Sequence, residues 1–141
     1  MANQMNPPYR IFVVDDNEDI RRLNAEVLLD YGYHVDTAED GALAWDALQL
    51  NHYDLLITDN EMPNLSGIQL LNKLHAAGMA LPVIIVSGSL PTEALSLHPW
   101  LHIEAMLLKP YTIAELLGTV EAVLTAALGR ALKSRSMASQ P

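Results

Sequence analysis

Short apolar runs, each followed at once by charged or hydroxyl-bearing residues, constrain the fold of this 141-residue chain more than any other feature. Such runs are typical of strands that are buried on both faces of a parallel sheet. Open α/β sheets bind ligands at the carboxyl ends of their strands, so the polar residues are expected to share one pocket. The runs and the residues that follow them are 11–14 with Asp15 and Asp16, 55–58 with Asp59, 83–86 with Ser87, and 105–108 with Lys109.

Segments with helical spacing separate the apolar runs. Ile20, Leu23 and Val27 fall on one helical face, and similar spacing recurs over 44–48 and 67–74. A further strand is expected over 33–37. Strict alternation of five strands and five helices predicts an α/β fold with a doubly wound parallel sheet.

The last two predicted helices differ in how clearly the sequence marks their start and end. Thr112 and Glu115 form a capping box ahead of an apolar stripe, which predicts a well-defined final helix. The preceding helix starts near Pro91 and is stopped by Pro99, because proline inside a helix removes a hydrogen bond and clashes with the preceding turn. We therefore expect the fourth helix to be short or irregular.

The length and the 50% hydrophobic content suit one domain with a substantial core. We place this domain at residues 9–128, after an N-terminal extension of residues 1–8. Residues 129–141 carry basic residues among serines and are predicted to form a flexible C-terminal tail.

Charge and composition argue against several classes of function. Seventeen acidic and eight basic residues give a net charge of -9, which opposes direct binding to nucleic acid or to an anionic membrane surface. The absence of cysteine excludes disulfides, thiolate metal sites and cysteine nucleophiles. The first ten residues contain neither a signal peptide nor a membrane span, so a cytoplasmic location is predicted.

Charge also indicates the chemistry of the predicted pocket. Three carboxylates about 5 Å apart would repel by roughly 3 kcal/mol per pair at an effective dielectric constant near 20, so they need a cation. Oxygen ligands without histidine or cysteine favour Mg2+, with Mn2+ as a substitute, over zinc. With the charge neutralised, Asp59 is the candidate nucleophile toward phosphorus, while Ser87 and Lys109 would bind the phosphoryl oxygens.

Four motifs then carry a resemblance to a known family. They are Val-Val-Asp-Asp-Asn at 13–17, Asp-Asn-Glu-Met-Pro at 59–63, Ser-Gly at 87–88 and Leu-Lys-Pro at 108–110. In order and spacing the chain resembles the receiver domain of two-component response regulators over about Tyr9 to Leu128. The resemblance implies a flavodoxin-like sheet with strand order 2-1-3-4-5.

The resemblance also implies a function and a set of roles. Asp59 would form an aspartyl phosphate by taking a phosphoryl group from a histidine kinase or a histidine phosphotransfer protein, and the modified domain would change its affinity for an unknown downstream protein. The chain would catalyse this transfer onto itself only. Asp16, Asp59 and the backbone carbonyl of Glu61 would bind the metal directly, and Asp15 would bind it through water. The Lys109–Pro110 bond would be cis.

The chain departs from the family pattern at its switch. By this resemblance Ser87 and residue 106 would be the two switch positions, where an aromatic ring swings inward as the hydroxyl engages the phosphoryl group. Met106 stands where receivers usually carry that tyrosine or phenylalanine. Methionine is flexible enough to change its packing, although the usual paired movement of hydroxyl and ring is not implied. Glu61 adds a negative side chain at the mouth of the pocket, where it would affect the water that removes the phosphoryl group.

Two other functions fit parts of the pattern. An interaction module that works without phosphorylation is suggested by Met106 and by the interrupted fourth helix. An aspartyl-nucleophile phosphatase is suggested by Glu61, which stands two residues after Asp59 where such an enzyme carries its proton donor, although no substrate cap is visible. Taken singly, each motif also suits a cap, a turn or a surface charge, and only their convergence favours the receiver interpretation.

Overall fold

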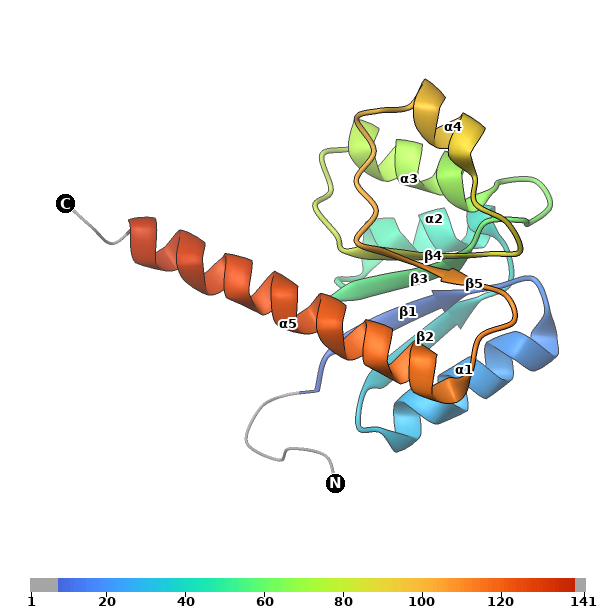
Figure 1. The fold of residues 1–141 in the computed structure, drawn as a ribbon, viewed down its shortest axis with the longest axis horizontal. Helices are drawn as coiled ribbons and strands as arrows, with labels where there is room; N and C mark the ends of the chain where they lie inside the picture. Colours follow the sequence, from blue (N-terminus) through green and yellow to red (C-terminus); the bar gives the residue numbers. More distant parts are fainter. Residues whose placement is uncertain (1–7, 139–141) are drawn as a thin grey trace.

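A computed structural model describes residues 8–138, in which five strands alternate with five helices (Figure 1). The strands form one parallel sheet in the order β2-β1-β3-β4-β5. The predicted doubly wound fold and its strand order are confirmed. The elements are β1 (Arg10–Val14), α1 (Glu18–Asp30), β2 (His34–Ala38), α2 (Gly41–Leu50), β3 (Leu55–Asp59), α3 (Gly67–Ala76), β4 (Val83–Ser87), α4 (Thr92–Leu97), β5 (Ala105–Leu108) and α5 (Ile113–Ala138).

Helices cover both faces of the sheet, with an apolar cluster under each layer (Figure 1). Leu28 of α1 and Leu116 of α5 pack with Ile57 on one face. Leu48 of α2 and Leu70 of α3 belong to the cluster on the other face. Every residue of β3 and β4 is buried, which is why these two central strands read as continuous apolar runs.

Most of the helices have a polar side chain that caps their N-terminus. The Asn17 side chain accepts a hydrogen bond from the Ile20 amide at 3.1 Å and so caps α1. The predicted capping box before α5 is present: the Glu115 amide donates to the Thr112 hydroxyl at 3.0 Å, and the Thr112 amide donates to the Glu115 carboxylate at 3.1 Å. These caps fix where each chain segment leaves the sheet edge.

The buried face of α1 differs from the predicted one. Asn24 and Leu28 are its buried residues, whereas Leu23 is 47% exposed. Asn24 tolerates burial because its amide donates a hydrogen bond to the Tyr111 hydroxyl at 2.7 Å, which satisfies a polar group inside the fold. The helix is therefore rotated relative to the apolar stripe expected from spacing alone.

Helix α4 is short, as predicted, and α5 is longer than predicted. Helix α4 ends at Leu97, with His98 as its C-cap, and buries no residue. Helix α5 continues past Gly129, where we predicted a flexible tail to begin, and reaches Ala138 beyond the sheet (Figure 1). One glycine costs a helix only about 1 kcal/mol, and strong helix formers surround Gly129. An ion pair of 2.8 Å between Arg130 and Glu104 also joins α5 to the segment before β5.

Parts of the predicted termini lie outside the described residues: residues 1–7 of the extension and 139–141 of the tail. In the part of the chain that the structure describes, no helix combines the length and hydropathy needed to cross a bilayer.

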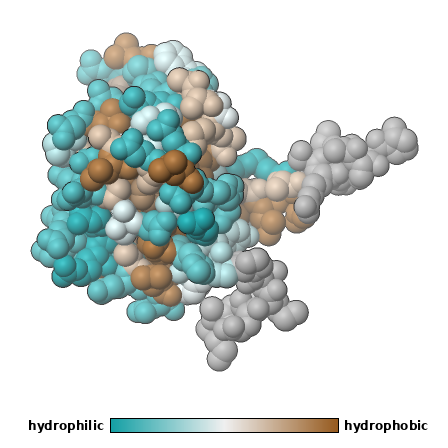
Figure 2. Space-filling view, turned by 180° about the vertical axis from the view of Figure 1, so that it is seen from behind, coloured by the Kyte–Doolittle hydropathy of each residue, from teal (hydrophilic) through white to brown (hydrophobic). Residues whose placement is uncertain are grey.

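Exposed apolar side chains are spread over several elements. They include Leu50 on α2, Leu97 on α4 and Leu132 on α5. On the face in Figure 2, apolar residues form small groups that polar residues separate. Scattered groups of this kind are ordinary on the surface of a folded domain.

Candidate functional site

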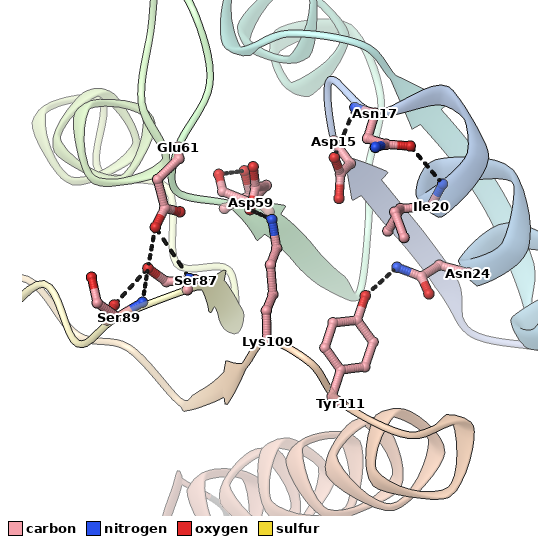
Figure 3. A network of polar contacts seen from close by, with 12 residues as sticks. Asp15, Asn17, Ile20, Asn24, Asp59, Glu61, Ser87, Ser89, Lys109 and Tyr111 are labelled. Atoms are coloured by element: carbon pink, nitrogen blue, oxygen red, sulfur yellow. Dashed lines mark hydrogen bonds and ion pairs between the residues drawn. The ribbon is translucent and has the colours of Figure 1, made fainter.

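The polar residues that follow the strands converge at the carboxyl edge of the sheet, as predicted. Asp15 follows β1, Asp59 is the last residue of β3, Ser87 is the last residue of β4, and Lys109 follows β5. Figure 3 shows the Lys109 side chain reaching to Asp59, with Asp15 on the neighbouring strand end. The site is therefore assembled from four strands.

Three carboxylates form the acidic part of the site. Asp15, Asp16 and Asp59 each offer a carboxylate oxygen, and these oxygens lie within 4.8 Å of one another. Asp15 and Asp59 are 3% and 2% exposed, whereas Asp16 is exposed to solvent. Asp15 also accepts a hydrogen bond from the Asn17 amide at 2.9 Å. This set of hard oxygen donors fits a divalent cation such as Mg2+.

Burial of the acids makes their negative charge unfavourable. Burial raises the pKa of Asp59 to about 6, and the charge of Asp15 adds to this effect, while the hydrogen bond from Lys109 opposes it. Burial likewise raises the pKa of Asp15, against the hydrogen bond from the Asn17 amide. A cation bound among these carboxylates would relieve both desolvation and repulsion.

Lys109 supplies a positive charge directly to Asp59. Its Nζ atom lies 2.7 Å from Asp59 Oδ1. Burial would lower the pKa of Lys109, but the hydrogen bond and charge of Asp59 outweigh burial and raise it, so the ammonium stays protonated. The Lys109 amide donates to the Ser87 carbonyl at 2.9 Å, and the bond to Pro110 is cis as predicted.

The loop after Asp59 is fixed by a close approach of α3. A Cβ atom added to Gly67 would lie 2.8 Å from the Asp59 carbonyl oxygen and 3.0 Å from Asn60 Cα. The Asn60 side chain accepts a hydrogen bond from the Ile68 amide at 3.0 Å. Glycine at position 67 therefore allows the start of α3 to pack on the backbone that carries Asp59 and Glu61.

Ser87 ends β4 at the predicted edge of the sheet, and its hydroxyl contacts Glu61, a partner that the sequence did not indicate. Ser87 Oγ lies 2.7 Å from Glu61 Oε1 and 2.6 Å from the Ser89 carbonyl oxygen, and the Gly88 amide donates to Glu61 Oε1 at 3.2 Å. Burial would raise the pKa of Glu61, but the hydrogen bonds from Ser87 and Gly88 lower it. Glu61 is therefore a carboxylate at neutral pH.

Two residues beside the acids were missed by the sequence analysis. Asn24 and Tyr111 join α1 to the segment before α5, and they line a cavity of about 870 Å3 together with the acids and Lys109. The signal for Asn24 is a polar residue at a helix position one turn before an apolar one, Leu28. Nothing local in the sequence points to Tyr111 as its partner.

Met106 is half-buried in β5, opposite Ile85 of β4. It packs against the apolar cluster under α2 and α3, which also contains Ile85. Residues alternate between the two faces of a strand, so Met106 lies on the same face of the sheet as Ile85, the residue two positions before Ser87. Its role in switching stays a prediction.

Comparison with known proteins identifies the family. Residues 11–121 match the response regulator receiver domain family. The chain is 35% identical over 130 residues to the sensor histidine kinase RcsC of Escherichia coli K12. This alignment covers 92% of this chain but only 13% of RcsC. It is 31% identical to the response regulator receiver protein CpdR of Brucella abortus, over 84% of this chain and 98% of CpdR.

A solved structure agrees with these sequence relatives. The Vibrio cholerae chemotaxis protein CheY4 superposes with a TM-score of 0.75 at 26% identity, over 82% of this chain and 98% of CheY4. The chain belongs to the receiver domain family of two-component response regulators.

Proposed function

We propose that Asp59 accepts a phosphoryl group in a Mg2+-dependent reaction and that the domain relays this change to a partner. The proposal rests on one observation above all: the buried Asp59 carboxylate lies between two further acids and the Lys109 ammonium. A carboxylate in this setting is both able to bind a cation and positioned to react with phosphorus.

The transfer exchanges one bond to phosphorus for another. A carboxylate oxygen of Asp59 forms the new P–O bond while the bond to the donor breaks, and the donor leaves with that electron pair. Lys109 carries a positive charge for one phosphoryl oxygen, and the Ser87 hydroxyl is a hydrogen-bond donor for another. The Lys109 ammonium lies 2.7 Å from Asp59 Oδ1, so its charge is beside the carboxylate that would react.

Four residues would hold the metal. Asp16, Asp59 and the backbone carbonyl of Glu61 would be direct ligands, and Asp15 would act through water, with Mn2+ able to replace Mg2+. Bound there, the ion would neutralise the acids and the charge that develops on the phosphoryl oxygens.

The phosphodonor would be a histidine kinase or a histidine phosphotransfer protein, and the downstream partner is another protein. In support, the comparisons include the sensor histidine kinase RcsC, of which this chain spans 13%. Under this proposal the chain modifies only itself and turns over no external substrate. The cytoplasmic location stays a prediction.

The phosphatase alternative is disfavoured by Glu61. That mechanism needs residue 61 to donate a proton, but its carboxylate accepts hydrogen bonds from Ser87 and Gly88 and its pKa is lowered. The same contact is compatible with the other alternative, an interaction module that needs no phosphorylation, because Glu61 engages the Ser87 hydroxyl in the unmodified protein.

Intact-mass measurement after incubation with Mg2+ and acetyl phosphate tests the proposal. We expect one added phosphoryl group in the wild-type protein and in Asp46→Asn, a matched change of an exposed acid on α2. Asp59→Asn should gain no mass. A wild-type protein that stays unmodified would favour the phosphorylation-independent module, and a label on serine or histidine would overturn the assignment to Asp59.

A further inference from the structure

The Glu61 side chain accepts hydrogen bonds from two donors at the end of β4, and one of them, the Ser87 hydroxyl, is the donor proposed above for a phosphoryl oxygen on Asp59. Glu61 Oε1 accepts from the Ser87 hydroxyl at 2.7 Å and from the Gly88 amide at 3.2 Å. Figure 3 shows its carboxylate turned toward Ser87. A carboxylate and a phosphoryl group both present negatively charged oxygens, so both suit the same donors.

We propose that Glu61 is an internal competitor of the phosphoryl group, which holds Ser87 and Gly88 while Asp59 is unmodified and releases them when it is phosphorylated. The inference rests on the proposed function of Asp59. It assigns to this side chain a role that is separate from the metal contact of the Glu61 backbone.

Competition follows from the number of hydrogens and from charge. The Ser87 hydroxyl has one hydrogen, so it donates to one acceptor at a time, and Glu61 and the Ser89 carbonyl oxygen already lie within hydrogen-bond distance. A phosphoryl oxygen that takes this hydrogen removes it from Glu61. The negative charges of the phosphoryl group and the Glu61 carboxylate would then repel each other, which favours movement of the side chain.

Release of Glu61 would alter the loop that leads to α4. Glu61 lies in the loop between β3 and α3, whereas Ser87 ends β4 and Gly88 begins the loop between β4 and α4, so the contact joins the two loops. Helix α4 has no side-chain cap and buries no residue, so little else in its own turns anchors it. The loop contact is therefore a candidate moving part in a receiver that lacks the aromatic switch residue.

Binding of beryllofluoride, a stand-in for the phosphoryl group on Asp59, tests the competition directly in the presence of Mg2+. We expect Glu61→Ala to bind beryllofluoride at least fivefold more tightly than the wild type in isothermal titration and to react faster with acetyl phosphate. Glu61→Gln keeps the shape but loses the charge, so its affinity should lie between the two. Glu26→Gln, the same charge change at an exposed position of α1, should match the wild type.

Amide hydrogen exchange of residues 88–97 supplies a second readout without any phosphoryl analogue. Exchange in this segment should be faster in unmodified Glu61→Ala than in the wild type, because the contact between the loops is lost. Equal or weaker beryllofluoride binding by Glu61→Ala, with the wild type still binding, would overturn the competition and leave the function of Asp59 standing. If neither protein binds beryllofluoride or gains a phosphoryl group, the proposed function and this inference both fall.

Discussion

Lys109 Nζ lies 2.7 Å from Oδ1 of Asp59, which joins the ends of two strands that are not neighbours in the sheet. Asp59 ends β3 and Lys109 follows β5, so the pair spans β4. The lysine side chain is 39% exposed and the aspartate side chain is 1% exposed. Solvent screens the pair from one side, so its main effect is to place a positive charge at the carboxylate that we propose to react rather than to stabilise the fold.

Replacement of this charge should slow the reaction without moving its site. We expect Lys109→Ala to lower the rate of phosphorylation by acetyl phosphate about 10- to 100-fold, because the ammonium stabilises the transferring group but does not attack it. Intact mass against time gives the rate, and peptide mapping gives the site. Lys73→Ala on α3 is the control for loss of one lysine and should react at the wild-type rate.

Divalent cations should stabilise the fold through the three carboxylates. At a Mg2+ concentration tenfold above its dissociation constant, the free energy of unfolding should rise by about 1.4 kcal/mol, which is a shift of several degrees in melting temperature. Asp16→Asn should remove most of this shift, and because Asp16 is exposed the change should cost little packing. A melting temperature that does not change on addition of millimolar Mg2+ would contradict the proposal that these carboxylates bind the metal.

Without metal, the stability of the protein should fall as the pH rises from about 4 to about 6. Asp59 has a pKa of about 6 in the folded state and 3.8 as its ordinary value, so in this window the folded protein holds a proton that the unfolded chain releases. More protons on the folded state mean that the free energy of unfolding decreases with pH, by at most about 3 kcal/mol from this group.

Urea denaturation with a chelator at pH 4.5 and pH 7 measures this dependence. Asp59→Asn should remove most of the loss and should be more stable than the wild type at pH 7, since a neutral amide replaces a buried charge. The difference between the two proteins isolates Asp59 from Asp15, whose raised pKa acts in the same direction. Identical pH dependence in both proteins would show that Asp59 is not the group responsible.

The fold and the strand-end residues could be predicted because their signals are local. Strands β3 and β4 are buried along their full length, so each reads as an apolar run, and the polar residue that ends it marks the sheet edge. The capping box of Thr112 and Glu115 likewise depends only on neighbours in sequence. These features predict the alternation of strands and helices and most of the candidate site, whereas the strand order comes from the family resemblance.

The remaining features depend on contacts between distant segments. Glu61 meets Ser87 only because the loop after Asp59 folds back toward the end of β4, and no spacing rule encodes that path. Asn24 is buried because Tyr111 provides its partner. Helix α5 is longer than predicted: basic residues among serines predict a flexible tail from residue 129, whereas the residues around Gly129 favour helix strongly enough to continue it.

The last prediction concerns output through Met106. This side chain is half-buried in the apolar cluster under α2 and α3, and its flexible torsions let it repack without a discrete movement. The unmodified protein should therefore already sample much of the active arrangement, so that coupling between Asp59 and a partner surface is roughly 1 kcal/mol. Met106→Tyr should increase the coupling if the space beside Ser87 admits a ring, whereas Met106→Leu, which keeps apolar character and similar volume, should leave it unchanged.

The measurement is the affinity for a partner, or for a second copy where the protein self-associates, with and without beryllofluoride and Mg2+. For the wild type we expect a change of about fivefold, because each tenfold step corresponds to about 1.4 kcal/mol. A change of a hundredfold or more, about 2.7 kcal/mol, would contradict this interpretation of Met106. In that case Met106 would switch as effectively as an aromatic ring. The movement of Glu61 would then not be needed to explain how this receiver transmits its signal without an aromatic residue at position 106.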